Sequence, residues 1–332
     1  MIKSNIISKI VHLLTALPTP PCFLKTVNKL IFSFLWDNKP DKVNRIQVCQ
    51  EYKKGGLKMV DIYEFEKALK INWLKRKMCQ IDAQWVSLFS EIYHGSDKLY
   101  TFGGDWAIES NIAEQNLFWI SVFKSWKTFC QRNIPSNNTE IAQSCLWYNS
   151  LLSDTLLYFP NWHRKGINFV GDILKTNGNI MTREEMEDIY HFPINFLNYY
   201  KVCHSVIKFI QTFKKSDEFP IQKPFLPVNV KSLLISGKGC QSYYNILKSK
   251  TMNYSTSQRK WAEYLDTNSI DIWQIIFGNC FKTIKDNSII WFQYKLLYGI
   301  LPTRSYLKKI RKSECDKCAL CKECEETIVH LF

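Results

Sequence analysis

Apolar residues recur at helical spacing along most of the chain. Over residues 6–14, 23–35 and 62–73 they fall three or four positions apart, which places them on one face of an α-helix. Prolines between the first two stretches end one helix and start the next. The same spacing returns over residues 117–130, 261–278 and 289–299. The pattern therefore predicts a mainly α, multi-helix fold.

Turn and loop residues interrupt these helices. Residues 43–52 favour a short extended piece, and Gly55-Gly56 predicts a turn whose backbone needs the freedom of glycine. Residues 213–239 contain three prolines and two glycines, so we predict a loop there and place a soft domain boundary in it.

Two helix starts carry the spacing of a capping box. Thr182 stands three residues before Glu185, and Asp61 stands three residues before Glu64. In such a box the first side chain accepts a hydrogen bond from the backbone three residues on, and the second side chain bonds back. We therefore predict that helices begin at these two places.

Composition adds a substantial core and a basic surface to this picture. Hydrophobic residues make up 46% of the 332 and aromatic residues 14%, which excludes collagen-like and largely disordered classes. Lys and Arg outnumber Asp and Glu by 44 to 30, for a net charge of +14. Such a surface favours polyanions, nucleic acid first and an anionic membrane second. The alternative is a basic protein without a polyanion partner.

The first 22 residues loosely resemble a signal peptide, but His12 interrupts the apolar stretch and prolines occupy the place of the cleavage site. We interpret them as a helix. No stretch approaches 18 uninterrupted apolar residues, so no membrane span is expected. Outside the C-terminal cluster the cysteines are scattered, which favours reduced thiols and an intracellular location, cytoplasmic or nuclear.

Cysteines gather near the C-terminus. Cys315, Cys318, Cys321 and Cys324 follow one another at Cys-x2-Cys spacing, and His330 comes six residues later. Two thiolates held by a tight turn and joined by an imidazole suit the tetrahedral coordination of zinc. We therefore predict a small Cys/His zinc-binding segment with these five residues as candidate ligands.

Two other interpretations of this cluster remain. An iron–sulfur cluster would use four thiolates, but the usual trailing Cys-Pro is absent and His330 would be idle. A cysteine-rich tail without metal is the second alternative. Spacing alone does not decide which four of the five candidates would ligate a metal.

The same region carries a longer pattern. An aromatic-rich helix and a short helix flank Leu301-Pro302-Thr303-Arg304, and Cys318, Cys321, Glu326-Thr327 and His330-Leu331-Phe332 follow. This order is similar to the zinc-binding segment of reverse transcriptases from LINE-type (non-LTR) retrotransposons. The resemblance implies a zinc site whose final Cys has no counterpart here. The segment is therefore expected to be truncated before its fourth ligand, with Cys315 or Cys324 as a substitute.

Residues 31–76 resemble the same family independently, in the stretch just after the polymerase core. The matching features are Phe34 to Trp36, the basic segment from Lys39 to Arg45, Gly55-Gly56-Leu57, and Ala68 with Trp73. The resemblance is weaker in the middle of the chain. It implies a thumb-like helical region over 1–100, a helical C-terminal region over 101–285, and the zinc-binding segment over 286–332.

The catalytic residues of such a polymerase are missing from the sequence. The enzyme needs a Tyr-x-Asp-Asp turn and another Asp upstream, because carboxylates must hold two metal ions. No such turn occurs here, so we assign no catalytic residue. The chain is expected to be no enzyme by itself, and part of an RNA-directed DNA polymerase only with catalytic sequence upstream. Motifs of other enzyme classes are absent, and no small-molecule substrate is expected.

Basic residues interleave with aromatic ones in several segments. Lys and Arg neutralise phosphates, and aromatic rings stack on unpaired bases. The predicted nucleic-acid contacts are Lys53, Lys54, Lys75, Arg76, Lys77, Arg304, Lys308, Lys309, Arg311 and Lys312. The alternative is that aromatics such as Trp73 and Trp261 belong to the core while the basic side chains are merely solvated.

The resemblance therefore implies a non-catalytic region that binds template RNA or target DNA in target-primed reverse transcription, beside a polymerase core. The alternative is a degenerate or repurposed remnant that acts as a protein-interaction scaffold.

Overall fold

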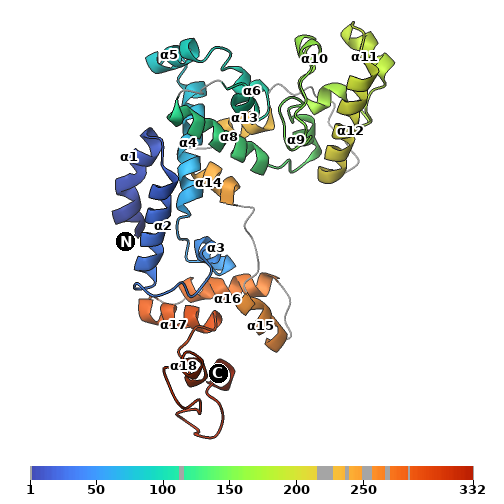
Figure 1. Ribbon diagram of the computed structural model, residues 1–332. Helices are drawn as coiled ribbons and strands as arrows, with labels where there is room; N and C mark the ends of the chain where they lie inside the picture. The colour runs from blue at the N-terminus through green and yellow to red at the C-terminus, as the bar shows by residue number, and fades with distance from the viewer. Residues whose placement is uncertain are drawn as a thin grey trace. The chain divides into compact units, whose positions relative to one another are not determined.

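The computed structural model describes residues 2–111, 116–214, 227–235, 239–248, 256–265, 270–282 and 285–331. Within these ranges the chain is all-α (Figure 1), and pairing between extended segments is limited to three isolated bridges. The mainly α, multi-helix fold predicted from the hydrophobic spacing is confirmed. None of the described helices combines the length and apolar character needed to cross a membrane.

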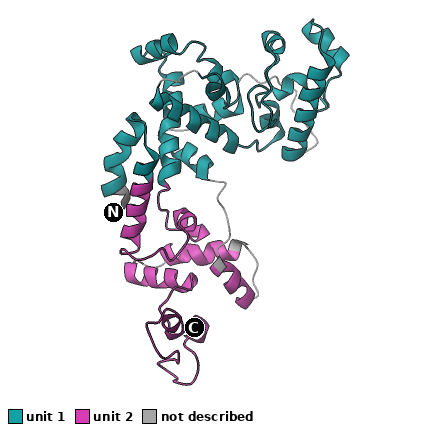
Figure 2. Cartoon of the chain, in the orientation of Figure 1, with its two compact units in different colours: residues 1–24, 62–250 teal, residues 25–61, 251–332 magenta. Residues whose placement is uncertain are grey.

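The described chain forms two units, and neither is continuous in sequence (Figure 2). The first unit comprises residues 1–24 and 62–250, and the second comprises residues 25–61 and 251–332. The three successive regions expected from the family resemblance, residues 1–100, 101–285 and 286–332, stay a prediction.

The first unit holds most of the helices. They are η1 (Ile2–Ile7), α1 (Ser8–Ala16), α4 (Ile62–Cys79), α5 (Gln84–Ile92), α6 (Lys98–Thr101), α7 (Trp106–Glu109), α8 (Leu117–Arg132), α9 (Asn138–Ala142), α10 (Pro160–Arg164), η3 (Val170–Ile173), α11 (Arg183–Tyr190), α12 (Phe196–Phe213), α13 (Val228–Ile235) and α14 (Gln241–Lys248). Helix α2 (Pro21–Leu35) begins in this unit and continues into the second.

The second unit holds fewer and shorter helices. They are α3 (Arg45–Cys49), η2 (Tyr52–Lys54), α15 (Thr256–Leu265), α16 (Ile270–Lys282), α17 (Asn287–Leu297), α18 (Arg304–Lys309) and α19 (Ile328–Leu331).

Helix α4 is the central helix of the first unit. The sequence predicted one apolar face for it, but Glu64, Glu66, Lys70 and Lys77 are buried as well. The reason is that α1, α8 and α14 pack around it. The buried charges have partners, as the 2.7 Å ion pair of Glu64 with Arg132 of α8 shows.

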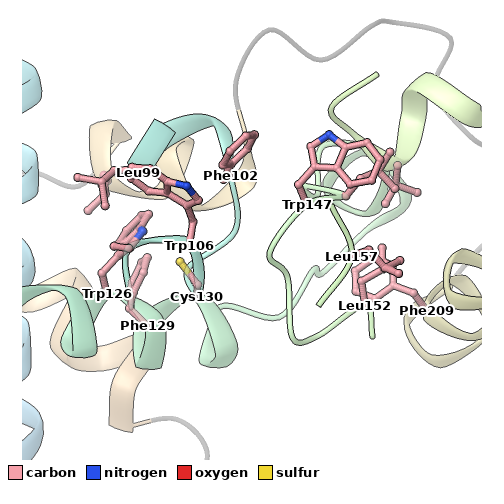
Figure 3. Packing of buried hydrophobic residues seen from close by; sticks show 14 of the residues in the cluster. Leu99, Phe102, Trp106, Trp126, Phe129, Cys130, Trp147, Leu152, Leu157 and Phe209 are labelled. Atoms are coloured by element: carbon pink, nitrogen blue, oxygen red, sulfur yellow. The ribbon is translucent and has the colours of Figure 1, made fainter. Parts of the chain in front are cut away.

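Aromatic side chains fill much of the core of this unit (Figure 3). Trp126 and Phe129 of α8 lie next to Trp106, with the first two rings stacked at 5.5 Å. Trp147 is also fully buried, and its indole N–H donates to the carbonyl of Ile167 at 2.8 Å. The aromatic-rich helix predicted over 117–130 is therefore a core helix.

The second unit has an aromatic core of its own. The ring centre of Trp291 in α17 lies 5.7 Å from that of Trp36, and the Trp291 ring stacks on Tyr294 with 5.4 Å between ring centres. The rings of Tyr294 and Tyr298 pack with their centres 4.7 Å apart. The Tyr298 hydroxyl donates to the carbonyl of Gly55 at 2.5 Å. This hydrogen bond holds the Gly55-Gly56 turn against the end of α17.

The glycine turn predicted at Gly55-Gly56 is confirmed. Gly55 has φ +78°, a left-handed conformation that costs other residues free energy. A Cβ on Gly56 would collide with the backbone carbonyl of Gln50. The first glycine is needed for its backbone angles and the second for its close approach.

The predicted helix starts are confirmed where the structure resolves the caps. The backbone of Thr182 donates to Glu185 at 2.8 Å, and the backbone of Glu185 donates to the Thr182 hydroxyl at 3.3 Å, which closes the capping box of α11. Helix α4 begins at Ile62, as the Asp61–Glu64 spacing predicted.

Two sequence predictions are corrected. Residues 43–52 are not extended: they contain α3, because the Asn44 side chain accepts from the backbone of Ile46 at 2.9 Å and caps a helix. The loop predicted over 213–239 contains α13, whose Val230 and Leu233 are buried. The rest of that loop lies largely outside the described residues.

Candidate metal centre and basic surface

The segment between α18 and α19 turns back on itself and brings two of its four cysteines together. An antiparallel bridge pairs Lys317 with Glu325, and the backbone of Cys318 donates to Cys324 at 2.8 Å. At the tip, Lys322 donates to the carbonyl of Cys318 at 2.9 Å. This turn places Cys321 beside Cys318, as the Cys-x2-Cys spacing predicted.

Three of the five candidate ligands gather at one point. The Sγ atoms of Cys318 and Cys321 and a ring nitrogen of His330 all lie within 4.8 Å of one another. Cys321 Sγ is 3.2 Å from His330 Nε2. Cys318 is buried, whereas Cys321 and His330 are exposed, so the group is open to solvent on one side.

Backbone amides donate hydrogen bonds to both sulfur atoms. Leu320 N–H donates to Cys318 Sγ at 3.4 Å. The amides of Cys324 and Glu323, followed by the side chains of His330 and Cys318, lower the pKa of Cys321 to about 6. A thiol with this pKa is largely thiolate at neutral pH, and the thiolate is the form that binds metal.

The last described helix, α19, positions the histidine. Thr327 Oγ1 accepts from the backbone N–H of His330 at 3.1 Å, and the Thr327 carbonyl accepts from Leu331 at 3.2 Å. These bonds hold the helical turn that directs the imidazole back to Cys321.

Glu326 connects the ligand loop to α18. Its Oε2 accepts from the backbone of Ala319, between the two cysteines, at 3.1 Å. Its Oε1 accepts from the backbone of Arg304 at 3.0 Å. The Ala319 amide, followed by the Arg304 amide, lowers the pKa of this carboxyl group. In the sequence Glu326 stands out only as part of the Glu-Thr motif, because its two amide partners are set by the folded loop.

The remaining two candidates lie outside the group. Cys315 Sγ accepts from the backbone of Lys317 at 3.4 Å, and Cys324 contributes its carbonyl to the loop bridge. Both are exposed. Among the described residues, the ligand atoms that converge are therefore two sulfurs and one nitrogen.

The three converging atoms fit a small tetrahedral ion. Metal–ligand distances of zinc place neighbouring S and N ligands about 3.6 to 3.8 Å apart. All three atoms lie within 4.8 Å of one another, and the Cys321–His330 pair lies at 3.2 Å. Movements of a few tenths of an ångström up to about one ångström would suffice for binding.

The basic residues of the same segment lie directly beside this group. Lys308 of α18 pairs with Asp316 at 2.7 Å, which ties the helix to the ligand loop. Arg304 reaches the carbonyl of Lys317 at 3.3 Å. Lys309, Arg311 and Lys312 are exposed, as are Arg304 and Lys308, so all five predicted contacts of this segment are open to solvent next to the ligand loop.

The other predicted contacts differ in exposure. Lys53 and Lys54 are exposed on η2, and Arg76 is exposed on α4, whereas Lys75 is half-buried. Lys77 does not lie where a nucleic-acid contact would be expected. It is buried, pairs with Asp97 at 3.3 Å and lies over two aromatic rings, so its ammonium is not presented to a phosphate.

Trp73 and Trp261 are packing residues, in line with the core alternative. The indole of Trp73 donates to the carbonyl of Thr15 at 2.9 Å, and that of Trp261 donates to Leu297 at 3.1 Å. Both rings are half-buried, so each also keeps part of its surface exposed.

Fold and site together define an all-α protein with a Cys2His group at metal-binding distance. No protein-family model matches the chain, and no curated protein matches it. Membership of the LINE-type reverse transcriptases therefore stays a prediction that rests on the sequence motifs.

Proposed function

We propose that this chain binds RNA or DNA as the region that follows the polymerase core of a LINE-type reverse transcriptase. A zinc ion held by Cys318, Cys321 and His330 would stabilise its basic terminal segment. The observation that carries the proposal is the direct connection between the ligand loop and α18. Glu326 bonds to both, and Lys308 pairs with Asp316.

The donor set supports zinc over the other interpretations. Two thiolates and an imidazole are borderline-soft ligands that suit zinc, whereas an iron–sulfur cluster requires more thiolates than converge here. The fourth position would be filled by water, or by Cys315 or Cys324 after a local rearrangement of the loop. Zinc would supply a structural cross-link between α19 and the turn that carries the cysteines.

The exposed basic residues support a nucleic-acid partner. Lys309, Arg311 and Lys312 follow one another at the end of α18 and beyond it. A structured loop next to them would hold these charges at fixed positions, which lowers the entropy lost when they contact phosphates. Binding is then expected to weaken steeply as salt rises.

Fluorescence anisotropy with a labelled structured RNA tests this proposal. The affinity of the wild type is compared with that of the variant Lys309→Ala/Arg311→Ala/Lys312→Ala over a range of salt concentrations. Loss of three phosphate contacts should weaken binding by about tenfold or more and lower the salt slope by about two to three. The charge-matched control is Lys124→Ala/Lys201→Ala/Lys208→Ala, three exposed lysines of the first unit, which should change binding much less.

Metal content is measured on the same protein. One equivalent of zinc that is lost in Cys321→Ser and retained in Cys315→Ser would support the three-residue site. The proposal fails if the wild type binds no nucleic acid at low salt. In that case salt-insensitive binding to a protein would favour an interaction scaffold instead.

A further inference from the structure

The first unit contains an aromatic cleft that the metal site does not involve. Its volume is about 720 Å³, and α4, α5 and the start of α8 line it together with Ala16 at the end of α1. The aromatic lining residues are Trp73, Trp85, Phe89, Tyr93, Phe118 and Trp119. Pockets of this size hold molecules as large as a nucleotide.

The walls are arranged around Trp73. Trp85 and Phe118 each meet its ring edge to face, at 5.5 and 5.6 Å. Trp85 and Phe118 are themselves only half-buried. The cleft therefore presents several ring surfaces that are held in place by one another, which lowers the entropy lost on binding a flat ligand.

One cation stands at this cleft. Among the described lining residues, Arg76 is the charged one, and its guanidinium lies 5.1 Å from the centre of the Trp73 ring. Gln80 and Asn116 add amide groups. Aromatic surface, amides and an exposed guanidinium match the π-face, the polar edge and the phosphate of a nucleotide. An apolar peptide would cover Arg76 without offering it an anion.

We propose that this cleft binds an unpaired base of an RNA or DNA strand, with Arg76 on the adjoining phosphate. The inference rests on the proposed function for its biological partner, but it concerns a different surface and different residues. It assigns the first unit a stacking site in addition to the basic segment of the second unit.

Photo-crosslinking of a bromouridine-substituted single strand of about ten nucleotides to the full chain tests the inference. Mass spectrometry should map crosslinks to peptides that contain Trp73, Trp85 or Phe118. Leu88 lines the cleft and is 56% exposed, so Leu88→Trp should obstruct the cleft without disturbing the core. Its matched control is Ile81→Trp, at a position that is 72% exposed and outside the lining set.

Leu88→Trp should reduce these crosslinks and the affinity for the strand by about tenfold, the effect of losing one stacked base. Ile81→Trp should leave both unchanged. Arg76→Ala should weaken binding about fivefold and reduce the salt slope by about one, while Arg164→Ala, at another exposed arginine of the unit, should not.

The outcomes separate the two proposals. Crosslinks confined to residues 304–312, with Leu88→Trp binding like the wild type, would overturn the stacking site and leave the proposed function standing. If no strand binds at all, a titration of uridine monophosphate followed by isothermal calorimetry decides. Binding that Leu88→Trp abolishes supports the cleft, and no binding to the wild type overturns it.

Discussion

At the scale of single residues, Glu326 shows how a side chain outside the ligand set can organise a candidate metal site. It accepts hydrogen bonds from the amides of Ala319 and Arg304. Residues that hold metal ligands in place typically change affinity by about 10- to 100-fold when they are altered. The two amides would otherwise have to find water as their acceptor.

We expect Glu326→Gln to weaken zinc affinity by about tenfold, because an amide nitrogen cannot accept the bond that one carboxylate oxygen accepts now. Chelator competition measures the affinity. Glu325→Gln is the matched control, since Glu325 is an exposed neighbour with the same charge and should behave like the wild type. Equal loss in both variants would mean that general charge, and not the two hydrogen bonds, matters.

Two glycines of the second unit should respond to alanine in opposite directions. In Gly56→Ala the new Cβ meets the backbone of Gln50, which cannot move aside cheaply, so we expect a loss of about 1 to 3 kcal/mol in the free energy of unfolding. In Gly278→Ala the Cβ meets Lys53 at an ordinary 3.7 Å inside α16. A gain of up to about 1 kcal/mol follows from helix propensity. Chemical denaturation measures both, and a stable Gly56→Ala would contradict the close approach.

At the scale of elements, Lys70 joins α4 to the end of α1. Its side chain is fully buried, donates to the carbonyl of Leu17 and lies 3.9 Å from Glu66. Burial lowers the pKa of Lys70 to about 8, and Glu66 opposes this shift. Because the pKa of Lys70 is lower in the folded state, folding disfavours its charged form. The contribution of Lys70 to the free energy of unfolding is therefore most favourable above the unfolded pKa of about 10.4, and it decreases as pH falls toward 8.

The stability of the wild type relative to Lys70→Met should therefore rise by about 2 kcal/mol between pH 8 and pH 10. Urea denaturation at a series of pH values measures it, and the difference between the two proteins cancels the titration of the tyrosines. Lys67→Met, at a residue that is less buried, is the control and should give a flatter difference. A flat difference for Lys70→Met would show that its ammonium is solvated.

The elements also show what a sequence can and cannot predict. Helices α2, α4, α8 and α11 follow the apolar spacing and the capping signals, because these are local properties of the chain. Helix α3 was missed because one Asn44 side chain decides its start. Burial of Lys70 and Lys77 was missed because it depends on which helices surround α4, and spacing along one helix does not contain that information.

The candidate metal site, too, could be predicted from the sequence only in part. Cys318 and Cys321 were predicted from local spacing, and the structure brings them together with His330. That Cys315 and Cys324 lie apart follows from the pairing of Lys317 with Glu325, which fixes which residues reach the tip of the loop. The aromatic cleft combines residues from four helices of the first unit, so no single stretch of sequence carried its signal.

At the scale of the whole molecule, each of the two units has an aromatic core, but the terminal segment of the second unit, residues 304–331, buries much less. The first has a large core in which helices such as α8 bury several aromatic rings. In the second, Cys318 is the buried residue among the described positions 304–331. Apolar burial is the main stabilising contribution to folding, so this terminal segment depends on hydrogen bonds and, on our proposal, on zinc.

Removal of zinc should therefore loosen one segment and leave the rest of the protein folded. Hydrogen exchange read by mass spectrometry, with and without a strong chelator, should show faster exchange over residues 304–331 and unchanged protection in α4 and α8. The reason is that metal-binding free energy acts as folding free energy only where the ligands are needed for structure. Cys321→Ser should reproduce the chelated state without chelator. Faster exchange in α8 after chelation would contradict this picture, because it would mean that the metal stabilises the protein well beyond the segment that holds its ligands.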